Sequence, residues 1–262
     1  MANEVQDFYE SFPFPSKKIP SKKDLYSNAV WVTKLIGKKP TDFKKGEKVL
    51  EAGCGTGEFS CGFALGNAEV LGIDLSASSI TRAKELAKRF NLTGITFKQM
   101  NILENNLPEK SFDYIFSMGV LHHNKYPKKA FIELVKLLKP GGCIVIGLYN
   151  SYGRLSVSFR RVILSLFAGK NPEKRIILAN KLFCADKPIT KQRRIWMMDK
   201  YCHPLEKSIS FEEVLSWFAE NNIEFVSSLP KVRSANKLNL VFEQISWFLK
   251  GKSFFTVAGK KK

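Results

Sequence analysis

Apolar and polar residues alternate along the middle of the chain in a pattern that predicts strands and helices in turn. Short apolar runs bounded by turn residues predict five strands, at 48–51, 69–74, 96–99, 114–117 and 143–148. Apolar residues at intervals of three and four predict helices at 58–65, 78–90 and 127–138. Strands that alternate with helices over short links form a parallel sheet covered on both faces. The pattern therefore predicts a doubly wound α/β fold that binds ligands beyond the carboxyl ends of its strands.

The regular alternation stops after residue 150. Apolar and basic residues interleave over the next segment in two or three predicted helices, and we interpret it as a helical cap inserted over the substrate side of the sheet. The core pattern then resumes with a helix whose start is marked by the capping box of Ser210 and Glu213. Three further elements are predicted, a strand at 223–229, a helix at 240–249 and a strand at 253–258. The chain thus divides into an N-terminal arm and helix (1–48), a core (49–150), a basic cap (151–208) and the C-terminal part of the core sheet (209–262).

The arm ahead of the core has an unusual composition. From Phe8 to Pro15 it is rich in aromatic residues, and its two prolines favour extended geometry at Phe12 and Phe14. A helix is predicted at 25–36. The arm either packs its aromatic side chains on the core or closes as a lid over a ligand, with Tyr9 facing the site.

Composition and charge narrow the classes of partner. The 262 residues are 44% hydrophobic, enough for a sizeable core, and carry a formal net charge of +18. Half of that excess falls in the cap, where thirteen basic residues stand against four acidic ones. Such a field attracts nucleic acid, anionic lipid surfaces or acidic substrates. The alternative is a general preference for lysine on solvated surfaces, which explains the lysines better than the pairs Arg160-Arg161 and Arg193-Arg194.

Cysteine usage and hydropathy favour a cytoplasmic location. The five cysteines are scattered without a C-x-x-C pair, as expected of reduced thiols. Residues 1–10 carry acids and no apolar run, so no signal peptide is predicted. Apolar stretches such as 162–168 are far too short to cross a bilayer. We therefore expect no transmembrane segment and at most peripheral contact with an anionic membrane.

A glycine-rich stretch follows the first predicted strand. Gly53, Gly55 and Gly57 alternate between an apolar run and a helix start, where backbone N–H groups approach a ligand closely. Dinucleotide sites use the spacing G-x-G-x-x-G, and neither possible frame places a glycine at the third position. About 20 residues further on, Asp74 ends the second predicted strand, where a carboxylate accepts hydrogen bonds from ribose hydroxyls. The stretch favours a nucleoside ligand without a pyrophosphate.

Five pieces of the sequence occur in a recognisable order and spacing. They are Glu51-Ala52-Gly53-Cys54-Gly55-Thr56-Gly57, Gly72-Ile73-Asp74-Leu75-Ser76, Met100-Asn101-Ile102, Phe112-Asp113-Tyr114-Ile115-Phe116-Ser117-Met118-Gly119-Val120-Leu121-His122-His123 and Leu138-Lys139-Pro140-Gly141-Gly142. Together they resemble the class I S-adenosylmethionine-dependent methyltransferases, over roughly residues 45–150. The resemblance implies a Rossmann-like, mostly parallel sheet of seven strands with one antiparallel strand. It also implies S-adenosylmethionine as the cofactor.

The resemblance further implies roles at the methionine end of the cofactor. Gly53, Gly55 and Gly57 would pass under the methionine part, with backbone contacts. Glu51 would orient that loop or contact the amino group, and Met118 would flank the same end.

At the nucleoside end, the resemblance implies that Asp74 accepts both ribose hydroxyls and that Leu75 lies against the adenine. Asn101 and Ile102 would meet the edge of the adenine. The family often has Asp where this chain has Asn101. Asparagine keeps one acceptor and adds two donors, so adenine recognition survives in a different arrangement.

Methyl transfer from a sulfonium is an in-line displacement whose leaving thioether needs no proton. The enzyme must position the reactants, exclude water and remove a proton from the acceptor where the acceptor requires it. His123, after the fourth predicted strand, and His203, at the end of the cap, are equal candidates for the base, although His203 could instead pin the cap. Candidate substrate or lid residues are Tyr9, Tyr149 and Asp199. No metal is predicted, because His203 with Glu206 is too small a ligand set.

Three functions follow from these features. The first is methyl transfer to an O or N nucleophile of a small-molecule or amphiphilic acceptor, including an anionic one. The second is an RNA methyltransferase that uses the basic cap; against it, Ser117-Met118-Gly119-Val120 lacks the Asn/Asp-Pro-Pro-aromatic motif of amino-directed nucleic-acid methyltransferases. The third is a non-catalytic module that binds a membrane surface through 155–168, and the intact cofactor motifs argue against it.

Overall fold

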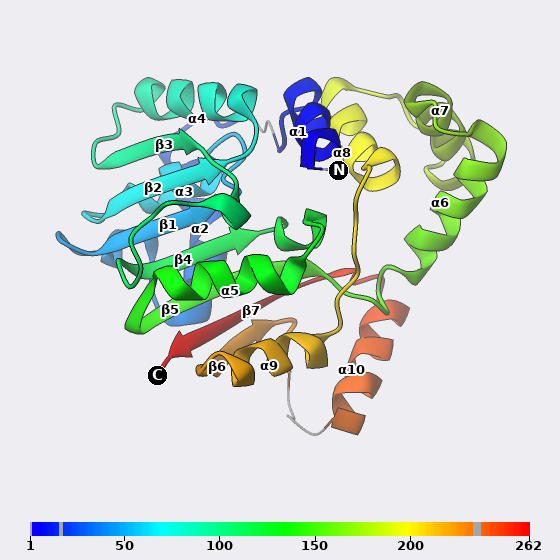
Figure 1. The fold of residues 1–262 in the computed structure, drawn as a ribbon. Helices are drawn as coiled ribbons and strands as arrows, with labels where there is room; N and C mark the ends of the chain where they lie inside the picture. Colours follow the sequence, from blue (N-terminus) through cyan, green and yellow to red (C-terminus); the bar gives the residue numbers. More distant parts are fainter. Residues whose placement is uncertain (1, 16–17, 233–236) are drawn as a thin grey trace.

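The computed structural model describes residues 2–15, 18–232 and 237–262. At its centre lies a seven-stranded sheet in the order β3-β2-β1-β4-β5-β7-β6 (Figure 1). The strands are β1 (Lys48–Ala52), β2 (Glu69–Asp74), β3 (Ile95–Gln99), β4 (Phe112–Met118), β5 (Leu138–Tyr149), β6 (Ile223–Leu229) and β7 (Phe254–Lys261). β1 to β5 pair in parallel, whereas β7 is antiparallel to both β5 and β6. The predicted fold class, a doubly wound and mostly parallel sheet with one antiparallel strand, is confirmed.

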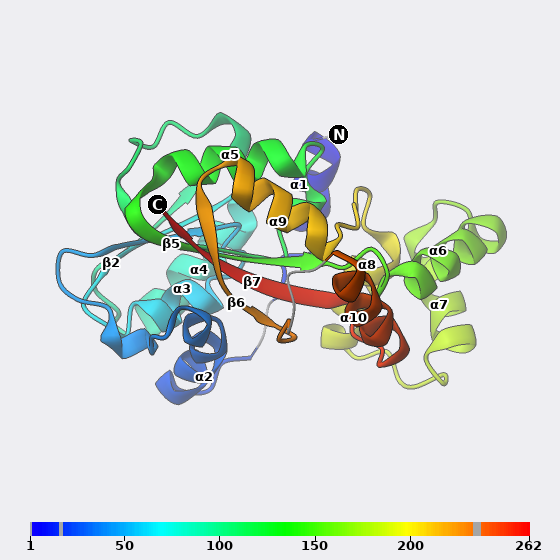
Figure 2. The same cartoon turned by 90° about the horizontal axis from the view of Figure 1, so that it is seen from below.

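Helices cover both faces of this sheet (Figure 2). On one face lie α2 (Lys22–Thr33), α3 (Glu58–Phe63) and α4 (Ala77–Arg89), and on the other α5 (Pro127–Leu137) and α9 (Phe211–Glu220). Successive side chains of a strand point to opposite faces. Leu50 of β1 therefore joins the core under α5 and α9, and its neighbour Val49 joins the core under α2 and α3.

Short 3₁₀ helices lie between these elements, at Lys34–Ile36, Pro40–Asp42, Ile102–Glu104 and Leu121–His123. The helix α10 (Lys237–Leu249) follows β6 and precedes the last strand. None of the helices in the described ranges has both the length and the apolar character that crossing a bilayer requires.

A second layer of helices stands beyond the carboxyl ends of the parallel strands (Figure 1). It consists of α1 (Ala2–Ser11), α6 (Leu155–Ala168), α7 (Pro172–Phe183) and α8 (Lys191–Cys202). The cap has a hydrophobic cluster of its own, whose buried residues include Leu164 of α6, Ile176 of α7 and Tyr201 of α8. Phe8 and Phe12 of the arm pack against that cluster, so arm and cap together form a roof over the edge of the sheet.

The arm begins with the helix α1, for which the sequence analysis made no prediction, and Phe12 and Phe14 lie beyond its end. Val5, Phe8, Tyr9 and Phe12 recur at intervals of three and four, the spacing of one helix face. The start of the helix after Ser210 was predicted correctly. The Ser210 side chain accepts a hydrogen bond from the backbone N–H of Glu213 at 3.1 Å, and α9 begins at the next residue.

Candidate functional site

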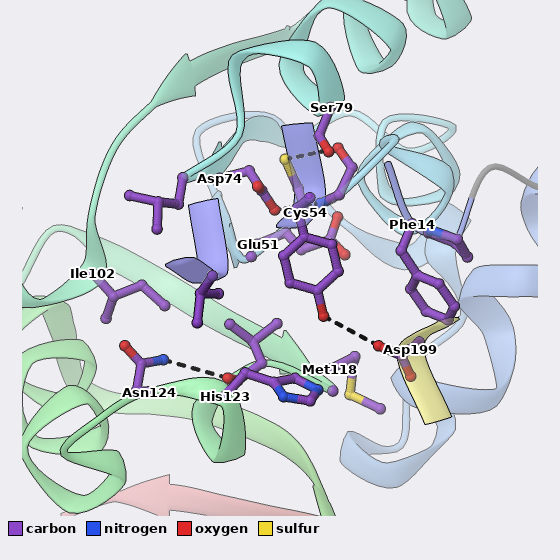
Figure 3. Close-up of a pocket in the computed structure, with 18 of the residues that line it drawn as sticks. Phe14, Glu51, Cys54, Asp74, Ser79, Ile102, Met118, His123, Asn124 and Asp199 are labelled. Carbon is purple, nitrogen blue, oxygen red and sulfur yellow. Dashed lines mark hydrogen bonds between the residues drawn. The ribbon is translucent and has the colours of Figure 1, made fainter. Parts of the chain in front are cut away.

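A cavity of about 550 Å³ lies where the strands end and the roof begins (Figure 3), which is within the usual range for small-molecule sites, roughly 300–1,000 Å³. Its walls come from the glycine loop after β1, the end of β2, residues 100–104 and 118–126, the arm and α8. The predicted site residues that line it are Tyr9, Glu51, Gly53, Gly55, Asp74, Leu75, Asn101, Ile102, Met118, His123, Tyr149 and Asp199. Gly57 and His203 are absent from this wall within the described part of the chain.

The glycine loop is shaped by close contacts with other parts of the protein. Gly53 and Gly55 have φ angles of +77° and +51°, in the left-handed region that favours glycine. A Cβ on Gly53 would stand 2.3 Å from a methyl group of Val120, and one on Gly55 would stand 2.2 Å from the carbonyl oxygen of Phe14. Val120, in the loop after β4, and Phe14 of the arm therefore occupy part of the space beside these two glycines.

Gly57 departs from its expected place at the methionine end. It precedes α3 with φ of +85°, and a Cβ there would lie 2.8 Å from the Cβ of Ala83 in α4. The third glycine thus allows α3 and α4 to pack closely, and it supports the loop from below the cavity wall.

Asp74 links the tip of β2 to the glycine loop. Its carboxylate oxygens accept hydrogen bonds from the backbone N–H groups of Gly55 at 2.8 Å and Ser76 at 2.9 Å. Burial raises the pKa of this carboxyl group, and the N–H donors act in the opposite direction. A carboxylate has about four acceptor sites, so Asp74 retains capacity to accept further donors at the cavity wall.

Glu51, at the end of β1, is almost fully buried and accepts a hydrogen bond from the Ser60 hydroxyl. Burial raises the pKa of its carboxyl group to about 8, and the nearby charges of Glu58 and Asp74 act in the same direction. A cation in front of Glu51 would reverse that shift, which makes the residue a suitable partner for a ligand amino group.

The next two loops supply the remaining predicted residues of this half of the cavity. The side-chain oxygen of Asn101 accepts a hydrogen bond from the backbone N–H of Leu103 at 3.0 Å and caps the short helix after β3. Its amide NH₂ group remains as a donor. Leu75, Ile102 and Met118 add apolar wall around it.

The other half of the cavity is aromatic and centred on Asp199 of α8 (Figure 3). Tyr9 from the arm donates to one oxygen of Asp199 at 3.3 Å, and Tyr149 at the end of β5 donates to the other at 3.2 Å. Burial raises the pKa of both phenols, and the charge of Asp199 adds to the effect. Arm, sheet and cap thus meet in one hydrogen-bonded group.

A buried ion pair stands behind Tyr149. The guanidinium of Arg154 lies 3.7 Å from the centre of the tyrosine ring and donates from Nε to the Glu206 carboxylate at 2.9 Å. Arg161 approaches the same carboxylate to 3.2 Å. The Arg154–Glu206 pair joins the start of α6 to the end of the cap, and the guanidinium of Arg154 packs on the ring of Tyr149.

The two candidate bases occupy different positions. Leu205 lies between them, since its carbonyl accepts from Nδ1 of His123 at 2.9 Å and its N–H donates to Nδ1 of His203 at 3.1 Å. His123 therefore carries its proton on Nδ1 and leaves Nε2 free to accept, whereas His203 carries its proton on Nε2. The ring centres are 3.7 Å apart, and the ring planes are tilted by 30°.

Burial lowers the pKa of both imidazoles, that of His203 to about 2. His123 lines the cavity, and His203 packs behind it against Phe8 and Tyr9. The geometry therefore separates the two candidates, since only His123 of the pair stands at the cavity wall in the described residues.

His123, Asp199 and His203 also bring three potential ligand atoms within 4.8 Å of one another, a grouping absent from the sequence prediction. The Leu205 N–H argues against an ion there, because it leaves the proton on Nε2 of His203 and a protonated nitrogen has no lone pair for a metal. Asp199 is moreover occupied by two phenols. The three side chains therefore lie close together while each has its hydrogen bond to another residue.

The charge of the cavity is opposite to that of the surface. Acidic residues that line it are Glu51, Glu58, Asp74, Glu104 and Asp199, against one lysine, Lys125, among the described lining residues. The chain as a whole carries +18. The wall therefore suits a cationic ligand.

Several wall residues were not found by sequence reasoning. Phe14 and Pro15 of the arm, Trp196 of α8 and Phe254 of β7 all line the cavity. The sequence signal of Phe14, Trp196 and Phe254 is their aromatic character in segments that surround the core motifs. The docking of arm and cap decides which of these residues face inward.

Comparison with known proteins identifies this architecture. Residues 43–206 match the family model described as a methyltransferase domain. The chain belongs to this family. Members of the methyltransferase family take their methyl group from S-adenosylmethionine. Asp74 lines the cavity, and the acidic residues of the wall suit a sulfonium cation.

Individual relatives include an uncharacterised protein and a phosphoethanolamine N-methyltransferase. An uncharacterised protein of Synechococcus is 25% identical over 85% of this methyltransferase and 58% of its own length. Phosphoethanolamine N-methyltransferase 2 of Caenorhabditis elegans is 31% identical over 56% of this chain and 34% of that enzyme. The chain thus spans little more than half of the first relative and about a third of the second.

Solved structures show the same fold. PKMT2 from Rickettsia typhi superposes with a TM-score of 0.68 and 19% identity, over 95% of this chain and 54% of that one. The magnesium protoporphyrin IX methyltransferase of Synechocystis, crystallised with S-adenosylhomocysteine, superposes with a TM-score of 0.60 and 14% identity over the whole of both chains.

Proposed function

We propose that this methyltransferase moves the methyl group of S-adenosylmethionine to an N or O nucleophile of a small-molecule or amphiphilic acceptor. One observation carries the proposal: a single stretch of cavity wall joins the glycine loop, Asp74 and Asn101 at one end to Tyr9, His123 and Asp199 at the other. A cofactor and an acceptor can therefore lie end to end in one enclosed space, as an in-line displacement requires.

The cofactor would occupy the half between β1 and β3. Asp74 would accept the ribose hydroxyls, and Glu51 would face the amino group of the methionine part. Leu75, Asn101 and Ile102 would surround the adenine, with Gly53, Gly55 and Met118 along the methionine part. S-adenosylmethionine supplies an activated methyl group on a sulfonium, and the chain's own task is to hold and orient it.

The acceptor would occupy the aromatic half. His123 would remove the proton of the nucleophile with Nε2, because the hydrogen bond from Nδ1 to Leu205 fixes that tautomer and the lowered pKa keeps the ring neutral. Tyr9 and Tyr149 would bound the acceptor and hold Asp199 in place. His203 would support the ring of His123 by packing against it.

The acidic wall favours an acceptor whose reacting end is neutral or cationic, such as an amine. An anionic part would bind at the mouth, where Lys125 and Tyr126 continue into a second groove. The other lysines of that groove are Lys128, Lys129 and Lys207. Methylation of RNA fits less well, because phosphates near the reacting centre would face carboxylates.

The test starts with a screen of a metabolite extract against methyl-labelled S-adenosylmethionine, followed by mass spectrometry of the labelled product. With that acceptor, His123→Gln should lower kcat by roughly 10²–10⁴-fold, the usual contribution of a general base. Affinity for S-adenosylhomocysteine should stay the same. Greater loss in His203→Gln than in His123→Gln would contradict the assignment, and absence of any labelled product would contradict the function.

A further inference from the structure

The helix α6 carries two apolar faces. Val157, Leu164 and Ala168 are buried in the cap. On the opposite side lie four exposed apolar residues at intervals of four, three and four, namely Leu155, Phe159, Val162 and Leu166. At 100° per residue these four positions fall within an arc of about 60°. Phe159 is 67% exposed and Leu166 is 76% exposed, whereas a helix that is apolar all round is normally buried.

The helix α10 repeats the arrangement. Leu240, Gln244 and Trp247 face the core. Its exposed apolar residues, at the same intervals of four, three and four, are Leu238, Phe242, Ile245 and Leu249. The coincidence of spacing makes a chance pattern a poor explanation, because single exposed apolar residues are common but ordered stripes are not.

The start of α6 and the end of α10 meet at one corner of the molecule. Gly153, just before α6, lies against Lys252, just after α10, since a Cβ on Gly153 would stand 2.4 Å from the Lys252 carbonyl oxygen. Both views place the two helices at the same end of the molecule, away from β3 (Figures 1 and 2). We call the eight stripe residues the α6–α10 face.

The charge around this face selects its occupant. The chain carries a formal net charge of +18, and Lys250 and Lys252 follow directly on the α10 stripe, both exposed. A second copy of the chain would bring like charges together over the apolar residues. A lipid bilayer that contains anionic headgroups matches both the apolar stripes and the basic rim.

We propose that the α6–α10 face docks on the surface of an anionic lipid bilayer. The stripe side chains enter the boundary between headgroups and acyl chains, and the lysines face the headgroups. Docking of this kind does not depend on methyl transfer, so it is measured separately from the proposed function.

Co-sedimentation with vesicles tests the proposal on the full chain. Vesicles of phosphatidylcholine alone are compared with vesicles that contain phosphatidylserine as well. We expect binding at least tenfold tighter to the second kind, and a decrease with salt. Phe159→Ser with Leu166→Ser should weaken binding about tenfold per residue, as expected for apolar side chains that leave a buried state. Lys250→Glu with Lys252→Glu should lower the preference for phosphatidylserine by roughly fivefold per residue.

Val226→Ser is the matched control, because Val226 is exposed on β6 outside the face. Unchanged thermal unfolding would show that each variant is folded. Equal binding of the wild-type chain to both vesicle types would overturn the proposal. Sedimentation equilibrium that reveals a dimer abolished by the same two substitutions, without vesicle binding, would overturn it in favour of self-association.

Discussion

Replacement of Asp74 by alanine tests the cofactor site most directly. The carboxylate holds Gly55 and Ser76 through two backbone hydrogen bonds and is proposed to accept two ribose hydroxyls. A hydrogen bond to a charged acceptor contributes about 1.5–3 kcal/mol. Loss of the two proposed ribose bonds therefore amounts to about 3–6 kcal/mol, which loosens binding by roughly 10²–10⁴-fold.

Isothermal titration calorimetry with S-adenosylhomocysteine measures this change without any acceptor. The matched control is Asp113→Ala. Asp113 also accepts a backbone N–H, from Lys48 at 2.8 Å, and pairs with Lys139 at 2.8 Å, but it lies at the start of β4, away from the cavity. We expect the control to bind like the wild type. Wild-type affinity in Asp74→Ala, with a folded protein, would refute the assignment of Asp74 to the ribose.

Two further predictions concern Glu51 at the end of β1 and Gly55 in the glycine loop. Burial raises the pKa of Glu51 to about 8, above its unfolded value, so the neutral acid favours folding below pH 4.5 and this contribution is lost as pH rises towards 8. This contribution amounts to about 5 kcal/mol at most. The free energy of unfolding in urea, measured without ligand, should therefore differ less between pH 5 and pH 8 in Glu51→Gln than in the wild type. An identical change with pH in both proteins would contradict this prediction. Gly55→Ala should displace the arm, since its Cβ would meet the Phe14 carbonyl at 2.2 Å. We expect calorimetry to show S-adenosylhomocysteine binding weakened by tenfold or more. The left-handed backbone strain of the new alanine, roughly 1–2 kcal/mol, adds to this effect. Gly46→Ala carries similar strain with nothing within 4 Å of its Cβ, so equal effects on binding in both variants would disprove the role of the arm.

The core could be predicted because its order is local. Each strand of the parallel part is an apolar run that ends in turn or motif residues, and the carboxyl ends of such strands converge. Asp74 and Asn101 therefore reach one cavity although they follow different strands. β5 was predicted too short: it begins at Leu138, since pairing of Phe112 with Leu138 extends the ladder past an irregularity in which β5 has the extra residues.

The roof could not be predicted at the same level. Phe8 and Phe12 have helical spacing, but their packing depends on the cap cluster, which forms from residues 145 or more positions away. The different positions of His123 and His203 likewise depend on the backbone of Leu205. Tertiary docking decides such contacts, and neither residue type nor spacing along the chain contains that information.

The attachment of the arm has a practical consequence for handling the protein. The Glu10 carboxylate accepts the backbone N–H groups of Ala77 and Ser78 at the start of α4, the latter at 2.9 Å, and the Phe14 carbonyl accepts from Thr56 of the glycine loop at 3.3 Å. A purification tag fused ahead of Ala2 would strain these anchors and disturb ligand uptake. The antiparallel β7 ends beside the beginning of β5, at the opposite end of the parallel strands from α1 (Figure 1), so a dye attached there would leave these anchors intact.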